Sequence, residues 1–156
     1  MIVVANESDR DQILQVTARA GVFSAEEVQC VTEIWQEYID LGVQTSGYTF
    51  FIDKEDDRAR GFICYGPRYL TDRVYDLYWI AVDPFARRLG IGRRLIERVE
   101  ASVREKGGRI LVIETSGTEN YAGTRAFYLA AGYRHEATLK DLYADNDDLL
   151  IFTKRM

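Results

Sequence analysis

The 156-residue sequence has little of what marks several specialised classes of protein. No run approaches the roughly 18 apolar residues of a membrane-spanning helix. The N-terminal stretch MIVVA is too short for the apolar region of a secretion signal. With two cysteines, the chain has no disulfide framework of the kind found in small secreted domains. We therefore expect a cytoplasmic protein that associates with no membrane.

The scarce residue types also limit the chemistry. Cys30 and Cys64 stand in apolar surroundings without the spacing of metal ligands, so we expect both to be reduced core residues and expect no metal site. We expect a structural or exposed role for the one histidine, His135. The net charge of −5 argues against a nucleic-acid partner, which requires a basic surface, and better suits a cationic substrate.

No repeat, linker or low-complexity block divides the sequence, so residues 1–156 are expected to form one domain. Apolar periodicity predicts the order β-α-α-β-β-β-α-β-α-β-β. The predicted strands are Ile2–Val4, Tyr48–Ile52, Gly61–Tyr65, Arg73–Val82, Arg109–Glu114, Tyr133–Leu139 and Leu149–Phe152. The predicted helices run from Ser8 or Asp9 to Ala20, from Ser24 to Gly42, from Ile91 to Lys106 and from Tyr121 to Ala131.

Local signals set the boundaries of these elements. Ser24, with Glu27 three residues later, predicts a capping box. We expect a charged turn over Asp53–Arg60 and an acidic turn over Asp145–Asp148, and we expect Gly66-Pro67 to break a strand. Because a helix connects Arg73–Val82 to Arg109–Glu114, these two strands should be parallel, in a mixed sheet with helices on both faces.

The sharpest local signal is Arg87–Gly92, which follows the longest predicted strand and opens a helix. The first amides of a helix are unpaired, and its macrodipole adds positive charge there. Gly90 and Gly92 would let a phosphate approach the backbone. An ordinary helix start with glycines for the turn would look the same. Two nucleotide motifs fit poorly, since Arg93 follows Gly92 in place of a lysine and Leu95 stands where a third glycine is needed.

A second segment makes the first one specific. It runs from Asn120 to Tyr133 and contains a Phe-Tyr pair, Phe127 and Tyr128, followed by a Gly-aromatic pair. Together with Arg-x-x-Gly-x-Gly from Arg87, in this order and spacing, it resembles the signature of the GNAT N-acetyltransferase superfamily. The resemblance extends from about residue 47 to the C-terminus and is vague before it.

The resemblance implies a fold of the α/β (α+β) class, with a mixed, mostly antiparallel sheet of six to seven strands. Two parallel strands, Tyr75–Val82 and Ile110–Glu114, would splay apart and hold acetyl-CoA, the acyl donor, between them. The pantetheine arm would pair with the backbone of Ile80 and Val82, and the Val82 amide would face the thioester oxygen. The residues expected to contact the donor are Ile80, Ala81, Val82, Arg87, Arg88, Leu89, Gly90, Ile91, Gly92, Arg93, Asn120, Phe127 and Tyr128.

The reaction implied by the resemblance is acetyl transfer to a primary amine of a small molecule or peptide, by direct attack in a ternary complex. Tyr128 matches the family's usual tyrosine acid, which would protonate the departing thiolate; otherwise it is a core residue. Asp76 is the first candidate for the base and Glu114 the second, although water chains could replace both. Asn120 would hold the pantetheine region, cap a helix, or do both.

The sequence is unusually aromatic, and most of these residues are expected in the core. Those on the predicted hairpin and on the Pro67–Asp72 loop should line the acceptor pocket, with acidic residues nearby. The aromatic residues concerned are Tyr48, Phe50, Tyr65, Tyr69, Tyr75, Tyr78, Trp79 and Tyr143, and the acidic ones are Asp141, Asp145, Asp147 and Asp148.

Other functions are compatible with the same residues. A non-catalytic sensor could bind acyl-CoA on this fold, and an interaction module could use the glycine turn structurally. An enzyme could also take another acyl donor. The resemblance leaves the amine and the acyl chain open, and it makes a homodimer one option for the assembly.

Overall fold

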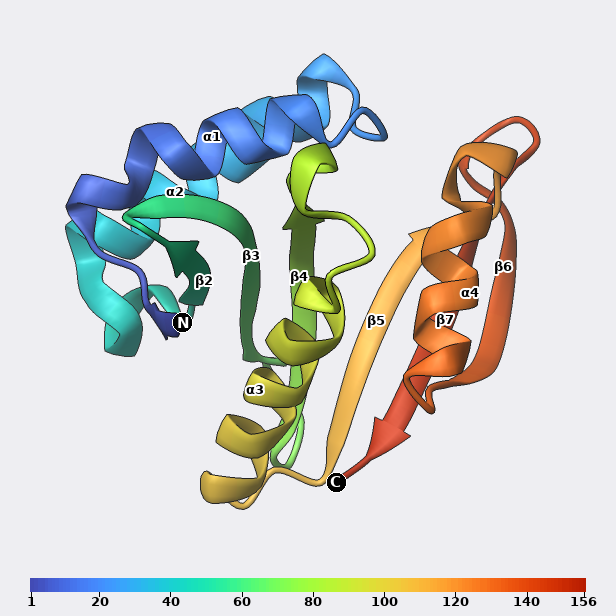
Figure 1. Ribbon diagram of the computed structural model, residues 1–156. Helices are drawn as coiled ribbons and strands as arrows, with labels where there is room; N and C mark the ends of the chain where they lie inside the picture. Colours follow the sequence, from blue (N-terminus) through green and yellow to red (C-terminus); the bar gives the residue numbers. More distant parts are fainter.

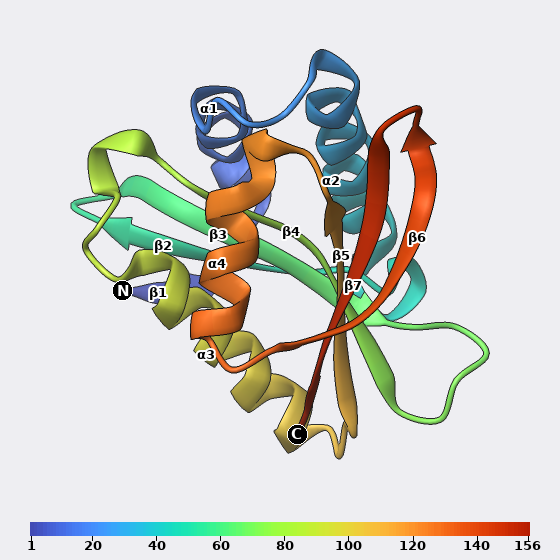
Figure 2. The same ribbon diagram turned by 90° about the vertical axis from the view of Figure 1, so that its right-hand side faces the viewer.

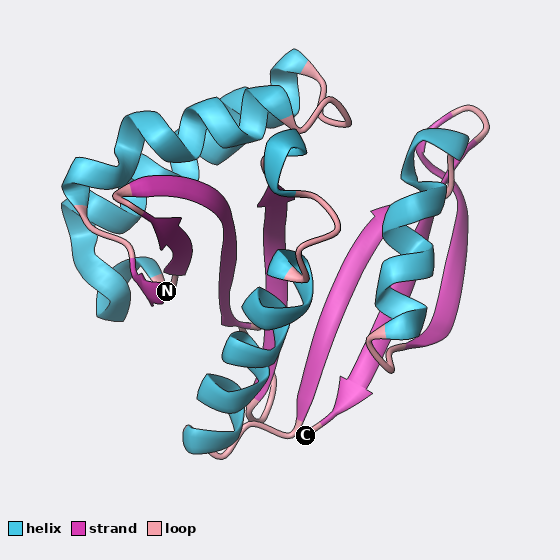
Figure 3. Ribbon diagram, viewed as in Figure 1, coloured by secondary structure: helices cyan, strands magenta, loops and turns pink.

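The computed structural model describes residues 1–156 and shows a seven-stranded mixed sheet with helices on both faces (Figures 1 and 3). The strands are β1 (Ile2–Val4), β2 (Thr49–Glu55), β3 (Arg58–Pro67), β4 (Val74–Val82), β5 (Ile110–Ser116), β6 (Arg134–Ala144) and β7 (Asp147–Arg155). The helices are α1 (Arg10–Arg19), α2 (Ala25–Ser46), α3 (Ile91–Glu105) and α4 (Ala122–Ala130), with 3₁₀ turns at Glu7–Asp9, Pro84–Ala86 and Glu119–Tyr121. The predicted fold and element order are confirmed.

The two faces of the sheet carry separate cores. The helices α1 and α2 cover one face, where Trp35 of α2 packs edge-on against Phe50 of β2. On the other face lie α3 and α4, seen clearly in Figure 2. Leu95 of α3 and Tyr128 of α4 belong to this second core. The strand order is β1-β2-β3-β4-β5-β7-β6, and the only parallel neighbours are β4 and β5.

A bulge in β4 accompanies the opening of the sheet. Cys64 pairs with Trp79 and Tyr65 pairs with Leu77, which leaves Tyr78 as an extra residue in β4. Such a bulge bends its strand and increases the local twist. The parallel ladder with β5 ends at the same place, because Leu77 is its last paired residue. Beyond it, β4 and β5 diverge (Figure 1).

The turns differ from those that the sequence predicts. The β2–β3 turn is the pair Asp56-Asp57, both with positive φ, whereas the predicted turn was Asp53–Arg60. The charged residues on either side of this turn belong to the paired strands β2 and β3. Their charge made them look like part of a loop in the sequence, so the predicted turn was too long. The strand β3 does end at the predicted Gly66-Pro67, although both residues still pair with β4. A proline is tolerated at a strand end. The β6–β7 turn is also shorter than Asp145–Asp148, because β7 already begins at Asp147.

Two predictions about α2 need correction. Gly42 does not end the helix: its backbone, with φ of 70° and ψ of 167°, makes a kink after which the helix continues to Ser46. Cys30 is exposed, whereas Cys64 is buried as expected. The apolar neighbour Val31 is buried, but successive helical residues are about 100° apart, so Cys30 points elsewhere.

No helix of the chain combines the length and the apolar character needed to cross a membrane.

Candidate active site

The divergence of β4 and β5 leaves a cleft of about 970 Å³. Its walls come from the separated halves of the two strands, from the first turns of α2, from α4 and from the β6–β7 hairpin. Elements that are far apart in the sequence therefore meet around one opening. The predicted catalytic residues Asp76, Glu114 and Tyr128 all line it.

The turn before α3 presents unpaired main-chain donors. None of the six consecutive amides from Arg88 to Arg93 donates a hydrogen bond within the chain, and the first internal partner belongs to Arg94, whose amide reaches the Gly90 carbonyl at 3.0 Å. Arg88 and Gly90 have positive φ values of 65° and 71°. The space around the α carbon of Gly90 is open. These amides and the N-terminal end of the helix dipole form a site suited to an anion.

The outer end of β4 also carries free backbone groups. The Asp83 amide donates to the Arg60 carbonyl of β3 at 2.8 Å. Because successive residues of a strand direct their backbone groups to alternate edges, Ile80 and Val82 direct theirs toward β5, which has already separated. The backbone groups of Ala81 are directed toward β3, with which it is paired, and its side chain is buried. The gap edge of β4 is thus open to pairing with an extended ligand.

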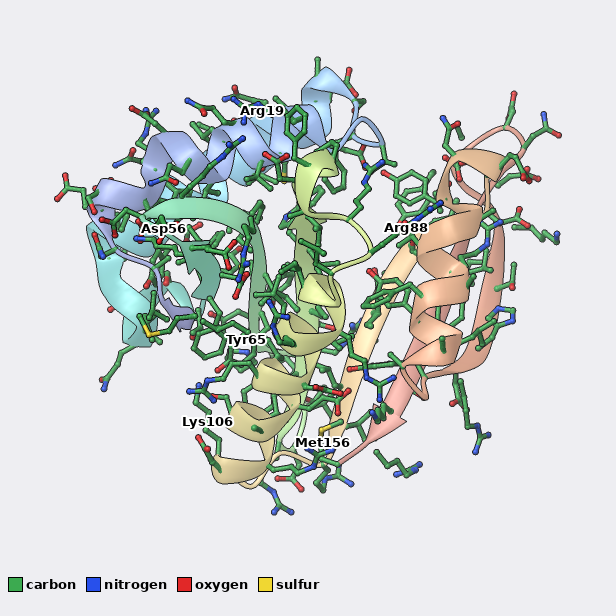
Figure 4. The ribbon with its side chains drawn as sticks, in the orientation of Figure 1. Arg19, Asp56, Tyr65, Arg88, Lys106 and Met156 are labelled. Carbon is green, nitrogen blue, oxygen red and sulfur yellow. The ribbon has the colours of Figure 1, made fainter.

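The turn, the strand end and α4 lie close together. A β carbon added to Gly92 would lie 3.4 Å from the ring of Phe127 and 3.7 Å from the side chain of Val82. The side chain of Arg88 points from the turn toward α4 (Figure 4) and has no internal partner. The free amides, the open strand edge and the Phe127–Tyr128 pair therefore surround one end of the cleft.

Tyr128 reaches the cleft from the core beneath α4. Its residue is 4% exposed, yet its hydroxyl is neither hydrogen-bonded in the chain nor fully enclosed, and it lines the cleft. Burial raises the pKa of Tyr128 above its ordinary value. The hydroxyl is therefore protonated at neutral pH and free to donate.

The two carboxylates of the cleft share one arginine. Asp76 accepts a hydrogen bond from Nη1 of Arg68 at 2.6 Å, and Glu114 lies 3.3 Å from both Nη atoms of the same guanidinium. Burial is the largest influence on Asp76 and raises its pKa; Arg68 opposes this and Glu114 adds to it, so that the pKa is above the ordinary value. An aspartate in such a site is a better base than one in water.

Several residues that were predicted to bind the donor can offer it only their backbone groups, because their side chains point away from the cleft or are engaged elsewhere. The Arg87 guanidinium donates to the Ala20 carbonyl at the end of α1, at 2.5 Å, because α1 ends beside this turn. Arg93 pairs with Glu97 on the helix surface. Ile91 is buried, whereas the side chain of Leu89 is exposed.

Asn120 lies on the surface, and its side chain makes no hydrogen bond within the chain. The residue before α4 is Tyr121, without a side-chain cap, so the capping role predicted for Asn120 is wrong. The Tyr121 hydroxyl instead donates to Glu27 of α2 at 2.8 Å and links two walls of the cleft.

The aromatic residues of the cleft differ in part from those predicted. Phe50 lies in the core, and Tyr65 lies beside Lys106 at the far end of the sheet (Figure 4), with 2.9 Å between its hydroxyl and Nζ. Tyr69 is exposed beside a separate depression. The aromatic lining comes from Phe23, Tyr78, Trp79, Tyr121, Tyr128 and Tyr143.

The acidic residue of the hairpin that lines the cleft is Asp147, which accepts a hydrogen bond from Ser116 at 2.6 Å. Sequence reasoning missed Arg68, although a signal exists: a hairpin between two strands brings the residue after the first strand near the start of the second. Gly66 indeed pairs with Asp76. Cys30 also lines the cleft, but partial burial, then Glu33 and Glu27, raise the pKa of its thiol, so it is a poor acyl carrier.

Comparisons with known proteins agree with this geometry. Residues 13–133 match the family described as "Acetyltransferase (GNAT) family". A crystal structure from Desulfovibrio desulfuricans, assigned to the GNAT acetyltransferases, superposes with a TM-score of 0.94 at 39% identity, covering 99% of each chain. No curated protein sequence matches the chain.

More distant structures share the fold. The ribosomal-protein-S18-alanine N-acetyltransferase from Escherichia coli has a TM-score of 0.78 at 19% identity, covering 99% of this chain and 92% of its own. An aminoglycoside 6′-N-acetyltransferase complexed with coenzyme A has a TM-score of 0.76 at 18% identity, covering 99% and 96%.

Proposed function

The chain belongs to the GNAT family of acetyltransferases, whose members use coenzyme A thioesters as donors, and from this premise we propose that it transfers acetyl from acetyl-CoA to a primary amine. The observation that carries the proposal is the run of six unpaired amides from Arg88 to Arg93, next to the separated strands. A pyrophosphate is a strong partner for such amides.

In the proposed complex, the diphosphate lies on the amides of Arg88–Arg93, with Arg88 close to its charge. The pantetheine arm runs along the free edge of β4 and pairs with Ile80 and Val82. The Val82 amide then faces the thioester oxygen, where negative charge develops during attack. Phe127 packs beside the arm, and Asn120 is available at the surface for a direct or water-mediated contact.

The reaction proceeds by direct attack. The amine nitrogen bonds to the carbonyl carbon, the C–S bond breaks, and the thiolate takes a proton from Tyr128. Asp76 accepts the proton that the amine loses, directly or through water, and Glu114 is the second candidate. Neither thiol is needed as a carrier, so donor and acceptor are bound together in a ternary complex.

The acceptor follows from the charge of the cleft. Five acidic residues line it, against one basic residue, Arg68; the acids are Glu26, Glu27, Asp76, Glu114 and Asp147. Amines are cations at neutral pH, so this wall attracts them. We assign the acceptor to cationic amines, either small molecules or peptide amines. The free thiols Cys30 and Cys64 fit the reducing cytoplasm, where we place the protein.

The direct test is a panel of amines incubated with acetyl-CoA and the protein, with release of free CoA thiol as the readout. Amine-dependent release supports the proposal. Tight CoA binding without release for any amine would instead identify a non-catalytic sensor, and absence of CoA binding would reduce the glycine turn to a structural feature.

We also propose that the protein forms a homodimer through β6. All 11 residues of this edge strand are exposed, including Leu139, Leu142 and Tyr143. A long edge with apolar side chains is a surface on which a second copy can pair. Sedimentation equilibrium tests this, with Leu142→Lys expected to yield monomers; a monomeric wild type would contradict it.

A further inference from the structure

Arg68 occupies a position that the proposed reaction does not by itself explain. It follows β3 directly and is held by its own backbone, since its amide donates to Val74 at 2.8 Å and its carbonyl accepts from the Thr71 hydroxyl at 2.6 Å. Its guanidinium lies between Asp76 of β4 and Glu114 of β5.

The guanidinium connects the two strands where their backbone pairing stops. Asp76 belongs to the parallel ladder, which ends one residue later, whereas Glu114 lies beyond its last pair. The contact distances are 2.6 Å to Asp76 and 3.3 Å to Glu114. The Asp76 side chain is 16% exposed, so its charge is only partly screened by water.

The charges of this group do not cancel. Two carboxylates and one guanidinium leave a single negative charge, and Arg68 is the one basic residue that lines the cleft. One ammonium group would complete the balance. Without Arg68, two like charges would face each other in a partly buried site, which is unfavourable for both.

We propose that Arg68 is the positioning residue of the acceptor site: it holds Asp76 and Glu114 together as a pair with one net negative charge, and that pair binds the ammonium group of a singly charged amine. The proposal rests on the proposed function in that this amine is the acetyl acceptor. Arg68 itself touches neither the acyl group nor the reacting nitrogen; it acts through the two carboxylates.

The charged and titratable groups around Asp76 determine the pKa that a titration of its carboxyl will measure. Arg68 faces it from the loop after β3, Glu114 from β5 and Tyr78 from β4, and burial and Glu114 raise its pKa while Arg68 lowers it. The other titratable or charged groups lining the cleft are Glu26, Glu27 and Cys30 of α2, Tyr121 beside α4 and Tyr128 within it, Tyr143 of β6 and Asp147 of β7.

The first measurement follows the Asp76 carboxyl by carbon NMR of protein labelled at aspartate carboxyls, assigned with Asp76→Asn. Arg68→Met should raise the apparent pKa of Asp76 by about one pH unit, and Arg68→Lys should restore part of the difference. Arg73→Met is the matched control, because Arg73 lies in the same loop but pairs with Asp72 outside the cleft. An unchanged Asp76 titration in Arg68→Met overturns the proposal.

The second measurement uses two probes, 1-aminobutane and 1,4-diaminobutane, whose dissociation constants are read from the same Asp76 signal. The wild type should bind both, and Arg68→Met should favour the diamine over the monoamine by roughly fivefold more than the wild type does. An unchanged ratio, or no response of the wild-type signal to either amine, overturns the proposal. Neither readout needs acetyl-CoA, so loss of turnover alone would count against the proposed function instead.

Discussion

Tyr128 combines two properties that rarely occur together in a buried tyrosine: its ring belongs to the core, and its hydroxyl is unpaired and open to the cleft. Replacing it with phenylalanine removes the hydroxyl and leaves the packing intact. We expect Tyr128→Phe to lower kcat by about 10²-fold, the ordinary range of acid catalysis. Steady-state kinetics and CoA titration measure this, with the Kd for CoA unchanged. A kcat equal to that of the wild type would exclude the acid role.

As the proposed base, Asp76 should make the rate depend on pH in a defined direction. A base must be deprotonated, and burial raises the pKa of Asp76 despite its contact with Arg68. The active carboxylate is therefore lost, as pH falls, at a value above the roughly 3.9 of an ordinary aspartate. The pH profile of kcat/KM should show this acidic limb, and Asp76→Asn should abolish it, whereas Asp72→Asn on the nearby surface should not. A limb that persists in Asp76→Asn would assign it to another group.

For single residues, the sequence predicted the position correctly where a motif or a well-placed strand identified the residue. Tyr128, Asp76 and Glu114 do line one cleft, because their strands and helix were placed correctly. The failures concern side-chain direction. Arg87 turns to α1, and Cys30 is exposed, since neither direction is determined by the residue's own neighbours in sequence. Arg68 was missed because its role depends on contacts with two other strands.

In the proposed complex, donor binding depends on the turn before α3. Arg88 extends from it without an internal partner, so reversing its charge should act on a bound anion and not on the fold. We expect Arg88→Glu to weaken CoA binding by about tenfold, measured by calorimetry. Arg10→Glu, with the same change of charge at the exposed start of α1, serves as control. Equal affinities of Arg88→Glu and the wild type would place the phosphates elsewhere.

The start of α2 is fixed by the predicted capping box. Ser24 accepts from the Glu27 amide at 3.2 Å, and Glu27 accepts from the Ser24 amide at 2.7 Å. Ser24→Ala should lower the free energy of unfolding by about 1 kcal/mol, and the melting temperature by about 3 °C. Thermal denaturation measures this, and Ser24→Thr should retain most of the stability. No loss in Ser24→Ala would mean that α2 is held by packing alone.

Among elements, existence and order were predictable, and details of pairing were not. Apolar periodicity and turn signals located every helix and strand; each has one face in a core except β6, whose residues are all exposed. The bulge at Tyr78 has no such signature, since an extra residue in one strand is defined only by its partner strand. The length of the turn at Asp56-Asp57 was overestimated because the pairing of the charged residues beside it is also defined only by the partner strand. The sequence therefore predicted two parallel strands, while their divergence came only from the family resemblance.

On the scale of the whole molecule, two halves of the sheet are connected by a short parallel ladder of four residue pairs, from Val74 to Leu77 on β4. A ligand that contacts both halves should stabilise the folded state. At a CoA concentration 100 times Kd, the gain is about 2.7 kcal/mol. We expect the melting temperature to rise by roughly 5–10 °C. Differential scanning fluorimetry measures this, with Arg88→Glu as a weaker responder. No rise at millimolar CoA would contradict binding across the gap.

The free amides before α3 have a further consequence for how such a chain diverges. A peptide N–H is present whatever side chain follows it, so few positions of the turn, chiefly Gly90 with its positive φ, constrain substitution. The opposite wall is built from side chains of several elements, and each can be exchanged alone. Descendants of this gene should therefore change the amine they modify long before they change the nucleotide they hold.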